Sequence, residues 1–115
     1  MSSRYRVVAE WKAAYEDPIT LKASEVVLLD GETDNWEGHL WVWAQNSNGK
    51  EGWIPDTLIE TVNGRHYAKE EFSAVELTCN EGEILFGLRE THGWILCRSR
   101  MGSEGWVPAR NLEPE

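Results

Sequence analysis

Short apolar runs separated by Gly, Asn, Asp and Pro recur along the chain. The runs "VVLL" (26–29), "WVWA" (41–44) and "GWIP" (52–55) are rich in the β-branched and aromatic residues that favour strands. The segments "NSNGKE" and "SRMGSE" contain Gly49 and Gly102, which supply the positive φ of hairpin turns. No stretch of helix length carries a convincing 3.6-residue stripe, although "DTLI" and "ARNL" can each form one 3₁₀ turn. The pattern predicts an all-β protein.

The pattern occurs twice. "WVWAQNSNGKEGWIPDTLIE", which begins at Trp41, aligns without a gap on "WILCRSRMGSEGWVPARNLE", which begins at Trp94, at an offset of 53 (94 − 41). Upstream, "PITLKASEVVLL", which begins at Pro18, aligns on the segment that begins at Glu76 at an offset of 58, with Glu25 on Glu83 (83 − 25). About five short strands in each copy suit a small barrel, because closure removes exposed sheet edges. We therefore predict two five-stranded barrels in tandem, at 1–60 and 65–115, each closed by its own copy and joined by the short link "TVNGRH".

Charge narrows the classes of partner. The 20 acidic and 11 basic residues give a net charge of −9, which disfavours nucleic acid and anionic membrane surfaces and attracts basic peptide segments. No apolar run approaches the roughly 20 residues of a membrane helix. The opening "MSSRYRVVAEW" has no export signal, so we expect a cytoplasmic protein in which Cys79 and Cys97 are reduced, buried, apolar residues.

Nothing in the sequence favours catalysis. Cys97 and His92 are close in sequence, but the alternation of the strand buries Cys97 and no oxyanion loop follows it. The chain has no phosphate-binding Gly loop and no cluster with metal-ligand spacing. We therefore expect a protein that is not an enzyme and that uses no metal or other cofactor.

The segment from Trp41 to Pro55 resembles the second half of a Src-homology-3 (SH3) domain. A Trp, a hydrophobic hairpin, a Gly-x-x-Gly turn, an aromatic residue and a Pro follow one another at the family's spacing. The family's opening "ALYDY" corresponds to "AKEEF" (68–72) and more loosely to "VVAEW" (7–11), and its "ELSFxxGD" corresponds to "ELTCNEGE" (76–83). The chain is similar to a bacterial tandem variant of the family whose copies end in "GWVP".

This resemblance implies a peptide-binding site. In the family, proline-rich peptides in polyproline II form lie on aromatic ridges, while a Trp and loop acids hold a flanking Arg or Lys. Two of the three tyrosines that line the proline pockets are replaced, by Ala9 and Leu58 or by Glu70 and Asn111. Carried over by position, the ligand-binding residues are Trp11, Trp41, Trp53, Pro55, Phe72, Glu76, Trp94, Trp106 and Pro108.

Strand alternation supports an outward position for the indoles. Trp41 alternates with Val42 and Trp94 with Ile95, so each Trp should share an outer face with Trp53 or Trp106. Two indoles beside a carboxylate form a site for Arg or Lys, better developed in the second copy, where Glu76 is available. In the first copy Pro18 holds that place, with Asp17 beside it.

Alternatives remain open at this stage. The Trp faces can instead bury one another, or a second copy of the chain, in a structural or assembly protein, and a cell-wall-binding SH3-like module is a further reading. Trp36 and Trp43 have no Trp at the equivalent places and are expected to pack locally. The repeated Glu-x-His-x-Trp at 37–41 and 90–94 is expected to be a solvated strand end. The expected partner is a protein or peptide, basic or proline-containing; its identity and the oligomeric state are not encoded in any motif.

Overall fold

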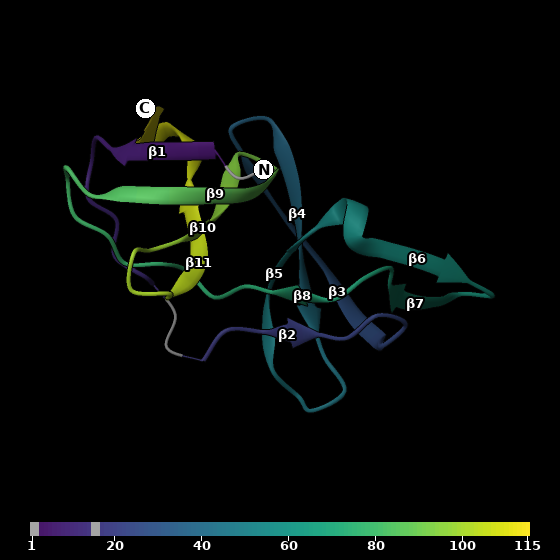
Figure 1. Ribbon diagram of the computed structural model, residues 1–115. Helices are drawn as coiled ribbons and strands as arrows, with labels where there is room; N and C mark the ends of the chain where they lie inside the picture. Colours follow the sequence, from purple (N-terminus) through teal and green to yellow (C-terminus); the bar gives the residue numbers. More distant parts are fainter. Residues whose placement is uncertain (1–2, 15–16) are drawn as a thin grey trace. The chain divides into compact units, whose positions relative to one another are not determined.

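The computed structural model describes residues 3–14 and 17–115 of the chain (Figure 1). Its regular structure consists of strands and two single 3₁₀ turns, η1 (Asp56–Leu58) and η2 (Ala109–Asn111), as the sequence predicts. The described residues include no helix that is long and apolar enough to cross a membrane. The strands are β1 (Ser3–Val7), β2 (Thr20–Leu21), β3 (Val26–Trp36), β4 (His39–Gln45), β5 (Glu51–Pro55), β6 (Ile59–Val62), β7 (Arg65–Ala68), β8 (Phe72–Ser73), β9 (Ile84–Thr91), β10 (Trp94–Arg98), β11 (Glu104–Pro108) and β12 (Leu112–Pro114).

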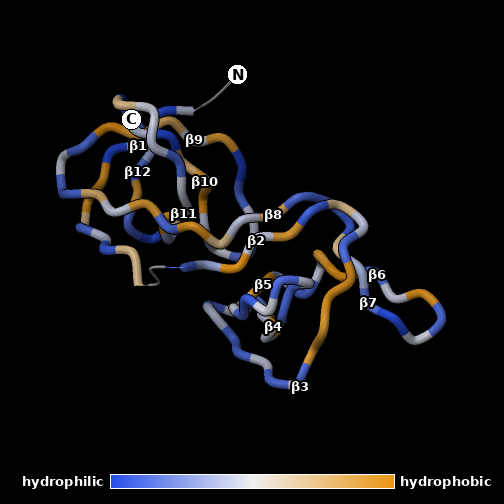
Figure 2. Tube along the Cα trace, turned by 90° about the horizontal axis from the view of Figure 1, so that it is seen from below, coloured by the Kyte–Doolittle hydropathy of each residue, from blue (hydrophilic) through white to orange (hydrophobic). Residues whose placement is uncertain are grey.

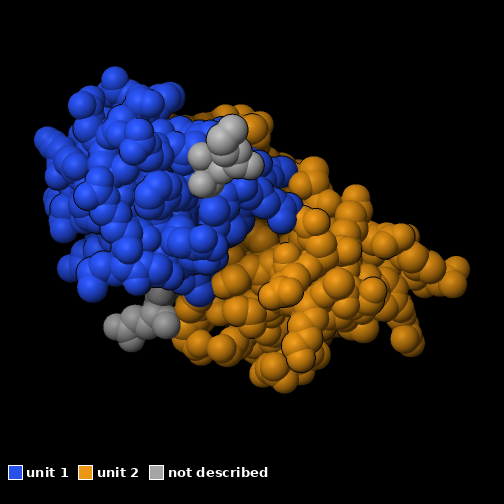
Figure 3. Space-filling view, in the orientation of Figure 1, with its two compact units in different colours: residues 1–16, 75–115 blue, residues 17–74 orange. Residues whose placement is uncertain are grey.

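The chain forms two compact units (Figure 3). Unit 1 comprises residues 1–16 and 75–115, and unit 2 comprises residues 17–74. Each contains a five-stranded antiparallel sheet, so the predicted all-β fold class with two small barrels is confirmed.

Unit 2 has the strand order β5-β4-β3-β7-β6, and the short strands β2 and β8 pair with each other. The segment expected to link two barrels is a tight turn inside this unit. Asn63 and Gly64 both have positive φ, at 51° and 78°, and they join β6 to β7 in an antiparallel hairpin. An Asn-Gly pair favours this kind of hairpin turn. Strand β7 then pairs with β3, with Val26 opposite Tyr67.

Unit 1 has the strand order β11-β10-β9-β1-β12. The N-terminal strand β1 therefore lies between two strands from the C-terminal half of the chain, beside β9 in Figure 1. Tyr5 pairs with Leu85 of β9 on one side and with Pro114 of β12 on the other. Val7, the last residue of β1, is 1% exposed and belongs to the core of this unit.

The opening strands of the two copies are exchanged. The predicted bounds 1–60 and 65–115 follow the duplication in the sequence, but each barrel takes its opening strand from the other copy. The expectation that each copy closes its own barrel therefore needs correction. The Asn63–Gly64 turn gives a physical reason, because a two-residue hairpin requires β7 to pair beside β6.

Each unit has its own apolar core, and Figure 2 shows apolar stretches distributed over both. The core positions of the two copies match where the strands match, for example Ala44 with Cys97 and Ile54 with Val107. The buried residues of unit 1 include Val7, Leu77, Cys79, Leu85, Ile95, Cys97, Val107 and Leu112. Those of unit 2 include Ile19, Leu21, Val27, Ala44, Ile54, Leu58, Ala68 and Phe72.

Candidate functional site

Two indoles and a carboxylate meet in unit 1. Trp11 and Trp94 form an edge-to-face pair with ring centroids 5.4 Å apart and an interplanar angle of 82°. The Trp11 indole Nε1–H donates to Oε1 of Glu76 at 3.0 Å. The same oxygen accepts the backbone N–H of Ala14 at 3.2 Å. We call Trp11, Glu76 and Trp94 the composite site, because its Trp11 comes from the first sequence copy and the other two residues from the second.

Backbone pairing fixes these side chains. Trp11 and Cys79 exchange two backbone hydrogen bonds of 2.9 Å, which place Trp11 against the second half of the unit. Glu76 lies in a parallel bridge opposite Trp106, and the flanking Leu77 N–H donates to the Trp106 carbonyl at 3.0 Å. Trp94 begins β10, where it pairs with Pro108 of β11. The site therefore depends on β-type pairing rather than on long free loops.

Burial sets the electrostatics of the composite site. Loss of water around Glu76 raises the pKa of its carboxyl, and the hydrogen bonds from Ala14 and Trp11 oppose that rise. Among the residues that the structure describes, no Lys or Arg pairs with this carboxylate. A half-buried acid with indoles beside it and no cation is stabilised by a positively charged ligand group.

Asn111 was not foreseen as part of this region. It replaces a family tyrosine, and it is buried in unit 1 at 7% exposed. Its side-chain amide donates to the carbonyls of Ala9 and Glu10, at 3.2 and 3.1 Å. These bonds hold the backbone immediately before Trp11, so Asn111 positions the indole. The sequence signal that could have indicated this role is the polar Asn111 at a position where the family has a tyrosine.

The remaining predicted residues of the second copy, Trp106 and Pro108, lie on the expected face, but they are buried. The register places Trp94 opposite Pro108 and Leu96 opposite Trp106, with Ile95, Cys97 and Val107 in the core. This confirms the predicted alternation. Trp106 is only 7% exposed and Pro108 is fully buried, so neither offers a free ring to a ligand.

In unit 2 the predicted residues Trp41, Trp53 and Pro55 lie on neighbouring strands. Trp41 pairs with Pro55, and Trp53 pairs with Trp43. Pro55 is buried. Asp17, the acid expected beside this surface, forms an ion pair with Lys50 at 2.8 Å.

Phe72 and Trp11 each lie in the other unit from the one that the sequence predicted. Phe72 is buried in unit 2 at 8% exposed, where its strand β8 pairs with β2. Trp11 belongs to unit 1. The cause is the strand exchange, because each residue follows its own opening strand into the other barrel.

Both cysteines are buried and neither forms a disulfide. The burial of Cys97 agrees with the alternation of its strand. Burial, with a smaller contribution from Cys79, raises the pKa of the Cys97 thiol to about 12. Such a thiol is almost entirely protonated at neutral pH and is a poor nucleophile. In the described part of the chain, no group of three His, Cys, Asp or Glu side chains is placed to hold a metal ion.

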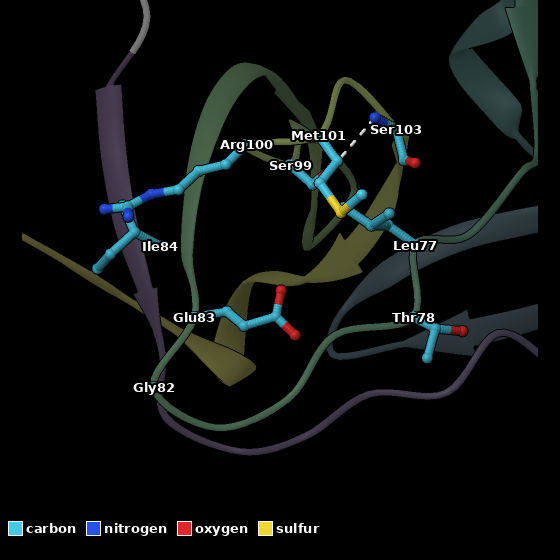
Figure 4. Close-up of a pocket in the computed structure, with 9 residues that line it drawn as sticks. All are labelled: Leu77, Thr78, Gly82, Glu83, Ile84, Ser99, Arg100, Met101 and Ser103. Atoms are coloured by element: carbon cyan, nitrogen blue, oxygen red, sulfur yellow. Dashed lines mark hydrogen bonds between the residues drawn. The ribbon is translucent and has the colours of Figure 1, made fainter.

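Unit 1 also has an open pocket of about 520 Å³ at the loop 99–103 (Figure 4). The Glu83 carboxylate and the Met101 side chain point into it, and Ser103 N–H donates to Ser99 Oγ at its edge at 3.1 Å. Glu83 already accepts a hydrogen bond from the Asn80 N–H at 2.8 Å. The pocket contains none of the predicted ligand residues and no aromatic ring. It is therefore separate from the composite site.

A family model described as "Variant SH3 domain" matches residues 4–62 and again residues 58–115. The two matches together cover nearly the whole chain. No curated protein and no solved structure is similar enough to count as a match.

Proposed function

The chain belongs to the variant SH3 domain family, whose domains are generally non-catalytic binding modules for proteins or peptides, and from this premise we propose that its composite site captures an Arg or Lys side chain of a partner peptide. The cationic group binds the Glu76 carboxylate, and its stem lies against the indoles of Trp11 and Trp94. Both indoles are partly exposed.

One observation carries this proposal: Glu76 is half-buried, hydrogen-bonded to an indole N–H and without a cation among the described residues. An arriving Arg or Lys compensates the cost of holding that charge out of water. A cation placed over an indole gains about 0.5–2 kcal/mol. The net charge of −9 adds long-range attraction for a basic segment.

The geometry favours the basic side chain over a run of prolines as the main determinant. Pro55 and Pro108, which correspond to the family's groove proline, are both buried. Ala9 and Asn111 replace two of the tyrosines that form proline pockets in the family, and Asn111 is occupied in holding the backbone before Trp11.

The test is a titration of the full chain with capped Gly-Arg-Gly, with Gly-Gln-Gly and with a proline-rich peptide that lacks basic residues. The Trp11 indole N–H resonance, assigned with Trp11→Phe, reports on the site by NMR. We expect a saturable shift with the Arg peptide alone. Glu76→Gln should weaken binding about tenfold, which corresponds to about 1.4 kcal/mol.

Glu81→Gln is the matched control, because it makes the same charge change at an exposed position of unit 1. It should change the affinity less than twofold. Equal weakening by Glu76→Gln and Glu81→Gln would reduce the effect to net charge and contradict the proposal. A response to the proline-rich peptide alone would also contradict it.

A further inference from the structure

A second aromatic face lies on the outer side of β4 and β5 in unit 2, separate from the composite site. Trp43 and Trp53 are directly opposite in the register, and their rings form an edge-to-face pair with centroids 5.1 Å apart at 75°. The Trp43 indole Nε1–H donates to Oε1 of Glu51 at 3.2 Å. Glu51 is opposite Gln45, in the next pair on the same face of the sheet. Trp43 therefore packs locally against Trp53, as expected from the sequence.

The neighbouring strand adds further carboxylates. The register between β3 and β4 slips between Leu29 and Thr33, so that Asp30, Gly31 and Glu32 form a bulge beside Trp43. Gly31 has φ +90°, and Glu32 N–H donates to Asp30 Oδ1 at 2.8 Å. The negative charge of Asp30 is the largest cause that raises the pKa of Glu32, and Glu51 contributes a smaller part. Asp30 and Glu32 thus lie side by side in the bulge.

Positive charge is scarce in the segment from β3 to β5. Residues 26–55 contain five acids, at positions 30, 32, 34, 37 and 51, and one Lys or Arg, which gives 1 − 5 = −4. The one cation of this segment, Lys50, is paired with Asp17. Leu28, opposite Gln45 and 59% exposed, adds apolar surface beside the carboxylates. Figure 2 shows the chain changing from hydrophobic to hydrophilic along β3.

The second copy shows that the fold does not require these residues. At the equivalent places unit 1 has Leu96 for Trp43 and Arg98 for Gln45. Arg98 neutralises the acid opposite it, with its Nη2 2.9 Å from Glu104 Oε2. Residues 84–108 contain three Arg and two Glu, which gives 3 − 2 = +1. The same sheet is therefore built without the paired outer indoles and without the excess of acid.

We propose that the Trp43–Trp53 face, with Glu51 and Glu32 at its edge, is a second binding surface for an extended basic segment of a partner protein. Charge complementarity selects this occupant over an apolar one. An Arg or Lys head group binds among the carboxylates while its stem lies on the indoles and Leu28. The described residues offer no metal cluster here, so a protein cation rather than a metal ion is the ligand.

The experiment titrates the full chain with a capped (Arg-Gly)₄ peptide at low salt and follows the Trp43 indole N–H resonance, assigned by its absence in Trp43→Leu. We expect a saturable shift. Trp43→Leu and Gln45→Arg, the residues of the second copy, should each weaken binding at this face about tenfold. For Trp43→Leu the Trp53 indole N–H serves as the reporter.

Glu60→Gln is the matched control for Gln45→Arg, because it also adds one unit of positive charge to unit 2, at an exposed position of β6. It should change the affinity less than twofold. Glu76→Gln should leave the Trp43 shift intact, which separates this surface from the composite site. Equal effects of Gln45→Arg and Glu60→Gln would overturn the proposal. A lower sedimentation coefficient of free Trp43→Leu than of the parent chain would also overturn it, because a second copy would then occupy the face.

Discussion

Units 1 and 2 share one strand order and one set of core positions, yet their acids have different partners. In unit 1, Glu76 is half-buried beside Trp11 and has no cation among the described residues. In unit 2, Asp17 is exposed and paired with Lys50. A charge already satisfied within the unit gains less from a ligand cation than one that is not. The composite site is therefore the stronger candidate of the two family-type positions.

On the outer sheet faces, it is unit 2 that has the excess of acid. Unit 2 presents indoles and an excess of carboxylates there, whereas unit 1 has Leu96 and the Arg98–Glu104 pair. The inward positions, such as Ile54 and Val107, kept their apolar character in both copies. Burial constrains the inward half of each strand, and the outward half was free to diverge after the duplication.

The largest expected effect concerns the strand exchange. The fragment 17–74 contains every strand of unit 2 and should fold cooperatively by itself. The fragment 65–115 lacks β1, the strand between β9 and β12, and should show no cooperative thermal transition by circular dichroism. Adding a peptide of residues 1–16 to this fragment should restore structure. Cooperative folding of both 1–60 and 65–115, with 17–74 unfolded, would instead mean that each copy closes its own barrel.

The second effect compares two equivalent glycines. A Cβ on Gly105 would lie 2.6 Å from the Leu77 backbone nitrogen and 2.7 Å from the Glu76 carbonyl carbon. A Cβ on Gly52 would meet the side chain of Ile19 at 2.8 Å, which can turn away. We expect Gly105→Ala to lower the free energy of unfolding by about 3 kcal/mol and Gly52→Ala by about 1 kcal/mol. Urea denaturation measures both. Equal losses would show that the backbone next to Gly105 makes room for a Cβ as easily as the Ile19 side chain next to Gly52 does, which would contradict this prediction.

Much of this fold could be predicted from the chain alone. The repeat, the β pattern and the turn glycines Gly49 and Gly102, which have φ of 85° and 91°, all appear in the structure. These features are local or depend on periodicity, so a single sequence carries them.

The exchange of opening strands could not be predicted from periodicity, because β1 and β7 have equivalent positions in the two copies. Only the Asn63–Gly64 turn distinguished the arrangements, since it requires a hairpin between β6 and β7. The composition of the site could not be predicted for the same reason. Trp11 and Glu76 were both candidate residues, but the contact between them depends on pairing of segments that are far apart in the sequence. The burial of Trp106 was also hidden, because alternation gives the face of a residue and not what covers it.

The third effect is a contrast in pH dependence. Burial raises the pKa of Glu76 in unit 1, so its contribution to stability is present below the ordinary value of 4.5 and is lost as pH rises above it. Hydrogen bonds, first from the Ser47 hydroxyl, lower the pKa of Glu25 in unit 2. That contribution is present above 4.5 and is lost as pH falls. Each effect should stay within about 1 kcal/mol, because solvent screens both groups.

Urea midpoints of resolved NMR signals from each unit, at pH 3.5 and pH 7, measure this contrast. Relative to the parent chain, Glu76→Gln should stabilise unit 1 more at pH 7 than at pH 3.5. Glu25→Gln should destabilise unit 2 more at pH 7 than at pH 3.5. The same sign for both variants would contradict the assigned environments of the two carboxyls.

The smallest effect tests how little the outer faces contribute to stability. Arg98→Gln places the residue of the first copy in unit 1 and removes an ion pair whose side chains are 50% and 46% exposed. An exposed pair of this kind contributes about 0.2–1 kcal/mol at low salt. Gln45→Arg should add a similar amount to unit 2, because it creates the same cross-strand pair with Glu51. Both differences in urea midpoint should vanish near 1 M salt, where the screening length falls to about 3 Å. A loss of several kcal/mol that persists in high salt would show that Arg98 supports the sheet by packing, and the outer face would then not have been free to diverge.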